Sequence, residues 1–124
     1  MKIQLQSWKV EDLSFNMIDE AREENSFGLK TGQVFPQKET TKFVIIFDID
    51  LKDKHFDLDF QVSFVFTTEN EIDEEFKFSN FPKINAPAIA FPFIRSYVSN
   101  FTLQSGFDPV ILPSINFVKL AKED

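Results

Sequence analysis

Paired carboxylates are the residues of this chain whose spacing could do chemistry. Asp48 and Asp50 stand two residues apart, as do Asp57 and Asp59, so each pair would project from one face of an extended strand. Such a pair could hold a hard cation or act as a general acid and base. The same spacing is typical of a solvated strand face, because Asp is seldom buried. We interpret both pairs as a polar strand face, so the sequence predicts no metal site and no cofactor.

Other residues that catalysis commonly needs are scarce. His55 is the one histidine, and it falls beside a predicted turn, where we expect it to be exposed to solvent. The chain has no Cys, so it can form neither disulfides nor thiolate metal sites. No Ser occurs in a nucleophile-elbow context, and the three Gly residues form no phosphate-binding loop. The sequence therefore predicts a protein that is not an enzyme.

Charge and hydropathy restrict the compartment and the partners. A net charge of -7 argues against nucleic-acid binding, which needs clustered Lys and Arg. The first residues lack the apolar segment of a signal peptide, and no run approaches the roughly 20 apolar residues of a membrane span. We therefore expect a cytoplasmic protein without membrane insertion, and the length of 124 residues predicts a single domain over 1–124.

Alternating apolar residues identify the elements that must position the carboxylates. Large apolar residues occupy every second position in 43–51 and in 56–66, on either side of a polar turn at 52–54. A period of two is that of a strand, so the pattern predicts a hairpin with strands at about 41–52 and 55–68. Two strands cannot bury so much aromatic surface against each other, so another layer must cover that face.

Two further strands complete the predicted sheet. Residues 2–17 predict a first strand whose apolar positions change phase, as they do at a bulge or bend, or in a strand with both faces partly covered. Residues 19–41 are polar and contain Gly and Pro, which predicts a long connection. Residues 72–81 again alternate and predict a short fourth strand. These strands follow one another along the chain, which favours a meander with a long first crossover loop.

Helices follow the strands. Asn85 and Pro87 predict the start of a long helix, and Gly106 predicts its end. Ser114 predicts the cap of a last short helix over 115–121. The predicted core stripe of the long helix consists of Ile89, Ala90, Phe93, Ile94, Tyr97, Val98 and Phe101. The fold class is therefore α+β, a four-stranded antiparallel sheet covered on one face by a long helix and a short C-terminal helix.

The chain contains more aromatic residues than one small core needs. Phe occurs 17 times, against one Trp and one Tyr. A Phe ring either packs in a core, where burial contributes roughly 2–3 kcal/mol, or makes undirected apolar contacts. Residues Val44, Ile46, Val65 and Phe91 lie off the predicted core faces. They are our candidates for a subunit interface, so we expect a homodimer or homotetramer.

Three short segments resemble the SecB family of bacterial protein-export chaperones. Residues 3–6 with 11–15 are similar to that family's first strand. Residues 91–95 read Phe-Pro-Phe-Ile-Arg and resemble the family's Phe-Pro-Tyr-Ala-Arg. Residues 112–117 are similar to a segment that ends Pro-Val-Asn-Phe. The three occur in the family's order, around a matching strand pattern that extends over nearly the whole chain.

The resemblance implies a dimer of dimers that holds unfolded preproteins in apolar grooves. It also implies docking of the motor protein SecA on acidic sheet residues, and Asp12 matches one of them. Asn16 stands where the family has Glu, Ser96 replaces a Glu after the helix Arg, and we expect a short final helix without the family's extended tail. Some SecB-like proteins serve toxin–antitoxin systems instead, and these departures leave that role open.

The predicted function is therefore that of a holdase, a chaperone for unfolded polypeptide clients. Such a protein needs apolar contacts without directional demands and enough charge elsewhere to stay in solution. The candidate groove residues are Met17, Phe27, Phe35, Phe107 and Phe117, each of which could instead pack in the core. The alternatives are a dedicated partner-binding chaperone of a toxin–antitoxin system and a small-molecule carrier with a Phe-lined cleft.

Overall fold

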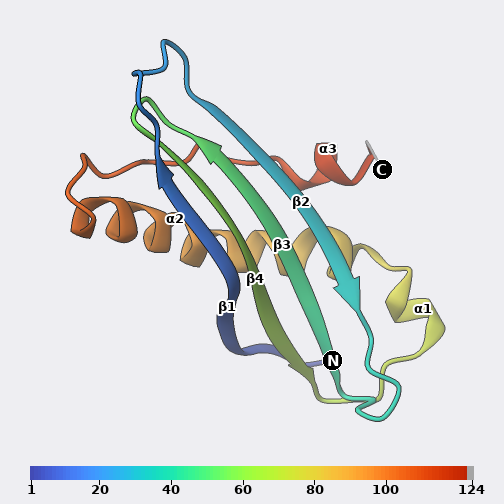
Figure 1. The fold of residues 1–124 in the computed structure, drawn as a ribbon. Coiled ribbons are helices and arrows are strands. Elements are labelled where there is room, and N and C mark those ends of the chain that lie inside the picture. Colours follow the sequence, from blue (N-terminus) through green and yellow to red (C-terminus); the bar gives the residue numbers. More distant parts are fainter. Residues whose placement is uncertain (123–124) are drawn as a thin grey trace. The chain divides into compact units, whose positions relative to one another are not determined.

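The computed structural model describes residues 1–122, with four strands followed by helices (Figure 1). The chain divides into two compact units, Met1–Asp73 and the part from Glu74 onward. The first unit contains β1 (Ile3–Met17), β2 (Ser26–Val34), β3 (Lys42–Lys52) and β4 (Phe56–Thr68). The second contains α1 (Glu74–Lys77), the π-helical turn η1 (Phe81–Asn85), α2 (Ala86–Gln104) and α3 (Phe117–Lys122). None of the helices within residues 1–122 is long and apolar enough to cross a membrane.

The strands form one antiparallel sheet in the order β1-β4-β3-β2. The first two strands lie at opposite edges, and residues 18–25 connect them across the end of the sheet (Figure 1). Hairpins join β2, β3 and β4, and β1 pairs with β4, which is a Greek-key arrangement. The predicted antiparallel sheet of four strands, the long helix and the short C-terminal helix are confirmed. The predicted meander order is wrong.

One strand lies where the sequence predicted a connection. β2 falls within residues 19–41, and all nine of its residues pair with β3. Gly28, Gly32 and the polar residues at 30, 31 and 33 weaken its alternation, so its own propensity for strand is low. Backbone pairing with β3 therefore stabilises β2, although the residues of β2 have a low propensity for strand.

The expected strand at 72–81 is helical instead. It contains α1 and the first residue of η1. Its alternating Phe residues imitate a strand, but Glu74 and Glu75 stand in the first turn of α1, where negative charge stabilises a helix. Pro82 occupies the start of η1, where a missing N–H group costs nothing.

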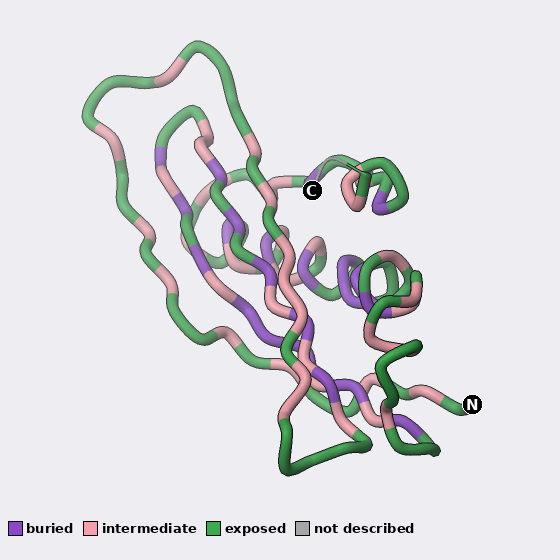
Figure 2. The backbone as a smooth tube through the Cα atoms, turned by 90° about the vertical axis from the view of Figure 1, so that its right-hand side faces the viewer, coloured by how far each residue is buried: buried purple, intermediate pink, exposed green. Residues whose placement is uncertain are grey.

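One face of the sheet, here called the inner face, carries rows of mainly apolar residues across the strands. Its residues on the central strands β3 and β4 are buried, and those on the edge strands are half-buried (Figure 2). The rows are Leu5–Phe66–Phe43, Trp8–Phe64–Ile45–Gln33, Val10–Val62–Phe47–Thr31, Leu13–Phe60–Ile49–Leu29 and Phe15–Leu58–Leu51–Phe27. The hairpin predicted from alternation is therefore confirmed, with strand ends within one residue of those expected.

Two bulges keep the apolar residues of β1 on the inner face. The register with β4 shifts between Leu5 and Ser7 and again between Val10 and Asp12. Each shift places an extra residue in β1, which would otherwise turn every later side chain to the opposite face. Trp8 therefore stacks on Phe64, with ring centroids 5.4 Å apart. The bulge predicted from the change of phase is confirmed.

The limits of α2 differ from the prediction at one end. Asn85 has helical dihedral angles (φ -71°, ψ -45°) and makes no side-chain cap, because η1 continues directly into α2. The predicted cap at Asn85 is therefore wrong. The helix continues through Pro92, and Gly106 follows it with a φ of 96°, a conformation that favours glycine. The predicted stop at Gly106 is confirmed.

The last helix begins two residues later than predicted. Asn116, rather than Ser114, caps it, because Asn116 Oδ1 accepts a hydrogen bond from the Lys119 N–H at 3.1 Å. Residues 107–116, here called the arm, lead from the end of α2 back towards its beginning (Figure 1). There the Phe117 ring meets Phe91 edge-on, with centroids 5.7 Å apart.

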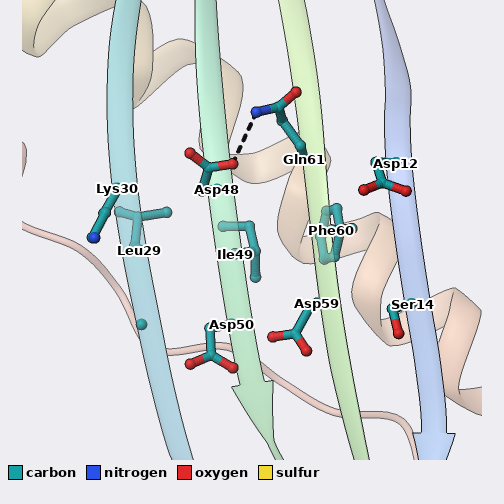
Figure 3. Close-up of a pocket in the computed structure, with 11 residues that line it drawn as sticks. Asp12, Ser14, Leu29, Lys30, Asp48, Ile49, Asp50, Asp59, Phe60 and Gln61 are labelled. Carbon is teal, nitrogen blue, oxygen red and sulfur yellow. Dashed lines mark hydrogen bonds between the residues drawn. The ribbon is translucent and has the colours of Figure 1, made fainter.

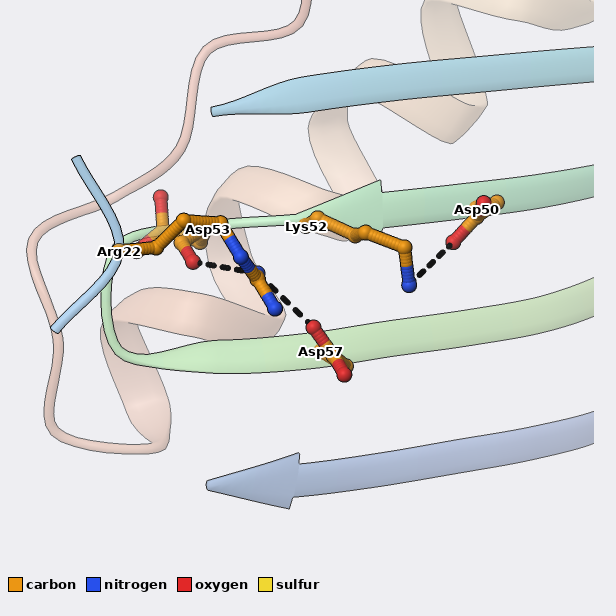
Figure 4. A network of polar contacts seen from close by, with 5 residues as sticks. All are labelled: Arg22, Asp50, Lys52, Asp53 and Asp57. Carbon is orange, nitrogen blue, oxygen red and sulfur yellow. Dashed lines mark hydrogen bonds and ion pairs between the residues drawn. The ribbon is translucent and has the colours of Figure 1, made fainter. Parts of the chain in front are cut away.

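Arg22 links the connection between β1 and β2 to the β3–β4 turn through hydrogen bonds and an ion pair (Figure 4). Its backbone N–H donates to Lys54 O at 2.8 Å, and its Nη1 donates to Asp53 O at 2.8 Å. The same Nη1 lies 2.9 Å from Asp57 Oδ1, an oxygen enclosed by protein that makes no well-aligned hydrogen bond. The guanidinium charge therefore compensates an oxygen that would otherwise lose its hydration without replacement.

We predict that Arg22→Ala lowers the free energy of unfolding by about 1–3 kcal/mol, because Asp57 is left without its cation. Urea unfolding followed by circular dichroism measures the change. Lys42→Ala is the matched control, because the pair of Lys42 with Glu39 is exposed and such pairs contribute only about 0–1 kcal/mol. Equal effects of the two substitutions would contradict the role given to Arg22.

Candidate functional site

The other face of the sheet, here called the outer face, carries a hollow lined by acidic side chains. The register aligns the rows Lys30–Asp48–Gln61–Asp12, Gly28–Asp50–Asp59–Ser14 and Ser26–Lys52–Asp57–Asn16. The first two rows line a shallow depression of about 740 Å³, here called the acidic hollow (Figure 3). Asp12, predicted as a docking residue, lies exposed in it. The bulge after Val10 turns Asp12 towards this face.

Asp50 and Asp59 face each other across β3 and β4 in the hollow (Figure 3). The pKa of Asp59 is raised above its ordinary value of 3.8, first by the hydrogen bond with Asp50, then by partial burial and by the charge of Asp50. Lys52, 3.7 Å from Asp50 Oδ1, offsets part of this effect. Two carboxyl groups that share a hydrogen bond need a proton on one of them, so ionising both is unfavourable.

The chemistry of the acidic hollow follows from its charge. Four aspartates line it with one lysine, Lys30, and Gln61 donates a hydrogen bond to Asp48 at 3.0 Å. Within residues 1–122, no three His, Cys, Asp or Glu side chains converge closely enough to hold a metal ion. A surface of this kind attracts Lys and Arg side chains of a partner. His55 lies outside the hollow in the β3–β4 turn and is exposed, as predicted.

The other end of the outer face is apolar. Val34, Val44 and Val65 occupy one row, and Ile46 belongs to the next. Val34 is 43% exposed, and the other three side chains are half-buried. The three residues predicted at a subunit interface from this sheet, Val44, Ile46 and Val65, are therefore neighbours on one accessible surface.

The buried stripe of α2 is rotated relative to the predicted one. Its buried residues are Ala86, Pro87, Ala90, Phe91, Ile94, Val98 and Thr102. Ile89 and Phe93 were predicted in the stripe, but they are 45% and 44% exposed. Phe91 was predicted off the core as an interface residue, and that prediction is wrong, since Phe91 is buried against Phe117. Periodicity could not select the buried side, because the helix is apolar on most of its circumference.

The candidate groove residues of the first unit lie at both ends of the inner face. Met17 is 67% exposed at the end of β1, and Phe27 is half-buried at the same end of the sheet. Phe35 follows the far end of β2, where it is half-buried and its ring stacks on Phe43 with centroids 6.0 Å apart. The structure therefore brings Met17 and Phe27 to one end and leaves Phe35 at the other.

The second unit places the remaining candidates differently. Phe107 is half-buried at the start of the arm, whereas Phe117 is 6% exposed and packs in the core with Phe91. Sequence reasoning missed two side chains that are far more accessible, Phe78 at 73% and Ile111 at 77%. The prolines that flank residues 110–112 were the available signal for Ile111, because they exclude that segment from helix and from a sheet interior.

The first unit thus combines an inner face rich in aromatic residues with an outer face that is acidic at one end and apolar at the other, in a chain of the α+β class. The family model of SecB, preprotein translocase subunit SecB, matches residues 1–124. The chain therefore belongs to the SecB family, as its sequence motifs predicted.

Two relatives are each 35% identical to part of the chain. One is an uncharacterised protein of Methanocaldococcus jannaschii, matched over 89 residues, or 66% of this chain and 56% of the relative. The other is the protein-export protein SecB of Dinoroseobacter shibae, matched over 72 residues, or 58% of this chain and 41% of the relative. The matches thus span about half the length of these relatives.

Two solved structures share the fold. The SecB-like chaperone Rv1957 of Mycobacterium tuberculosis, in complex with a ChAD peptide from the antitoxin HigA1, superposes with a TM-score of 0.72 at 14% identity. That match covers 91% of this chain and 90% of the other. A protein of unknown function from Streptococcus agalactiae gives a TM-score of 0.57 at 12% identity and covers 92% and 98% of the two chains.

We predict that Asp59→Asn raises stability at neutral pH. Because the pKa of Asp59 is raised in the folded protein, ionising Asp59 opposes folding above that pKa, and this penalty disappears as the pH falls below 3.8. The advantage of the variant should therefore be present at pH 7 and vanish in acid. Urea unfolding at a series of pH values measures it.

Asp19→Asn, which also removes one negative charge but from the exposed connection between β1 and β2, is the control for net charge. An advantage of Asp59→Asn that persists unchanged below pH 3.8, or that Asp19→Asn reproduces, would rule out repulsion at Asp50 and Asp59 as its cause.

Proposed function

We propose that this protein is a chaperone that holds unfolded polypeptides. The observation that carries the proposal is the exposure of large apolar side chains, among them Ile111, Phe78 and Met17, in a chain that belongs to the SecB family. Apolar contacts have no directional requirement, so they suit clients that share no sequence. The charge of the acidic hollow supports solubility while such a client is bound.

The proposed client contacts are those candidate groove residues that are accessible in the structure. Met17 and Phe27 offer one end of the inner face, Phe35 offers the other, and Phe107 adds the start of the arm. Phe117 is not included, because it is buried in the folded chain. A small-molecule carrier is less well supported, since such sites are enclosed and largely uncharged, whereas the acidic hollow is open and lined by four aspartates and a lysine.

We expect the purified protein to suppress aggregation of a chemically unfolded client at a near-stoichiometric ratio, as measured by light scattering. Met17→Ser combined with Phe27→Ser should weaken the suppression, because it removes apolar contacts from one end of the inner face. Val34→Ser, which alters an exposed aliphatic side chain on the outer face, is the matched control. A folded wild-type protein without any suppression would contradict the chaperone function.

A dedicated partner is the second candidate function. The fold match with a SecB-like chaperone in complex with an antitoxin peptide favours it. A SecA-type motor is the other candidate partner, and Asp12 in the acidic hollow would contribute to docking it. Asp12→Lys should then weaken binding of such a motor in a titration, and Asp19→Lys should not. Capture of one small partner from a lysate of the source cell, with no motor binding, would favour the dedicated role.

Self-association is proposed through α2. Ile89 and Phe93 stand four residues apart on its exposed side, so they form an apolar stripe suited to a second copy of the same helix. The apolar end of the outer face, with Val44, Ile46 and Val65, is the competing surface predicted from the sequence.

We expect sedimentation at micromolar concentration to show at least a dimer. Phe93→Asp should lower the mass of the sedimenting species, because it weakens the contact between the α2 helices of two copies. Val44→Asp is the comparison, because it places the same charge on the competing surface. A wild-type monomer would contradict self-association, and loss of mass in Val44→Asp alone would assign the contact to the sheet.

A further inference from the structure

The second bulge of β1 is compatible with two registers that the inner face does not distinguish. Between the apolar pairs formed by Val10 and by Leu13, β1 has two residues, Glu11 and Asp12, where β4 has one, Gln61. Apolar burial requires one extra residue at this point, because the extra residue keeps all later side chains of β1 in phase. Burial does not decide whether Glu11 or Asp12 is the extra one.

The choice between the two registers determines which carboxylate lies in the acidic hollow. Asp12 pairs with Gln61, and Glu11 is left unpaired, so Asp12 belongs to a row that lines the hollow (Figure 3). In the other register Glu11 would pair with Gln61 and take this place, and Asp12 would be the unpaired residue. The inner face would have the same pairs in both cases, so a contact on the outer face must select between them.

A hydrogen bond on the outer face provides this contact. Ser63 Oγ donates to Glu11 Oε1 at 2.7 Å, and Ser63 is only 7% exposed. A buried hydroxyl group needs a partner, and a bond of this length to a carboxylate is stronger than a bond between neutral groups. Lys9, which lies opposite Ser63, adds its Nζ 3.7 Å from the same Glu11 oxygen.

The other register would weaken this bond. Ser63 lies two residues beyond Gln61 on β4, in the row nearer the apolar end of the outer face. If Glu11 paired with Gln61, Ser63 would be its diagonal neighbour, and such neighbours are about 7–8 Å apart. The buried hydroxyl of Ser63 would then lose its short bond to the carboxylate. The observed register is therefore the one that satisfies Ser63.

We propose that Glu11, through its bond to Ser63, selects the register that places Asp12 in the acidic hollow, and that Glu11 is thereby a positioning residue for docking of a basic partner. The inference rests on the proposed role of Asp12 in docking and adds the contact that holds Asp12 in place. The side chain of Asp12 has fewer rotatable bonds than that of Glu11, so it loses less conformational entropy when a Lys or Arg side chain of the partner binds it.

Paired cysteines in the full chain report the register directly, because residues 1–122 contain no Cys of their own. Asp12→Cys with Gln61→Cys places two thiols on opposed residues, where oxidised glutathione can drive formation of a disulfide. Adding Ser63→Ala should slow this crosslinking about two- to fivefold, because loss of the hydrogen bond lowers the population in which the two residues pair.

A second cysteine pair, Ser14→Cys with Asp59→Cys, is the matched control. Its residues are also directly opposed, but they follow Leu13 and pair in both registers, so Ser63→Ala should leave their crosslinking unchanged. Ser63→Thr keeps a hydroxyl group and should restore the rate of the first pair. Glu11→Ala removes the acceptor instead of the donor and serves as the second variant if Ser63→Ala does not fold.

Binding of a labelled oligolysine peptide at low ionic strength tests the role in docking. With Ser63 present, Asp12→Asn should weaken binding about two- to fivefold more than Glu11→Gln, although each substitution removes one negative charge. Glu11→Gln retains an oxygen that can accept the bond from Ser63. In the Ser63→Ala protein the two substitutions should have similar effects, because either residue can then occupy the hollow. A general loss of stability would not change the ratio of the two effects.

The two experiments fail in different ways. Unchanged crosslinking of the first cysteine pair in Ser63→Ala, or an equal loss in the control pair, would overturn the selection of the register. Equal sensitivity of peptide binding to Asp12→Asn and Glu11→Gln while Ser63 is present would overturn the positioning role. If the folded wild type does not bind oligolysine, the hollow fails as a docking surface for a basic partner, and crosslinking still decides whether Glu11 selects the register.

Discussion

Pairing of β3 with β4 is the interaction on which the rest of the first unit depends. The two strands share eleven consecutive residue pairs without a bulge, so each inner-face apolar residue of β3 faces an apolar residue of β4. Side chains alternate between the faces of a strand, so the same pairing that assembles the inner aromatic rows also assembles the outer rows. The aromatic face and the acidic face are therefore two consequences of one register. A slip by a single residue would exchange them.

The same register places two carboxyl groups side by side on the outer face, which has an electrostatic cost. Once Leu51 pairs with Leu58, Asp50 must face Asp59, and the raised pKa of Asp59 reflects their shared hydrogen bond and their repulsion. Most residues on a solvated strand face can change without loss of the fold, so the fold itself does not require this charge density. Its concentration on one end of the face is what makes the acidic hollow a candidate for a basic partner.

In the second unit, a few polar groups hold an irregular segment in place. The arm has no strand partner, and the prolines in it cannot donate backbone hydrogen bonds. Thr102 and Ser99 supply the partners instead, from the side of α2 that faces the arm. These two hydrogen bonds fix the backbone of the arm at Val110.

The sequence by itself determined the long hairpin, the bulged first strand, the end of α2 at Gly106 and membership of the SecB family, because these depend on local period, turn chemistry or motif order. Tertiary structure decided the rest. β2 forms only because β3 offers an edge to pair with, so its weak propensity was misleading. Phe91 is buried and Phe93 is exposed, although α2 is apolar on most sides. Which of the two is buried depends on the side of the helix that packs against other residues. The hydrogen bonds of Thr102 join residues up to eight positions apart across a turn, a distance that no period or propensity encodes.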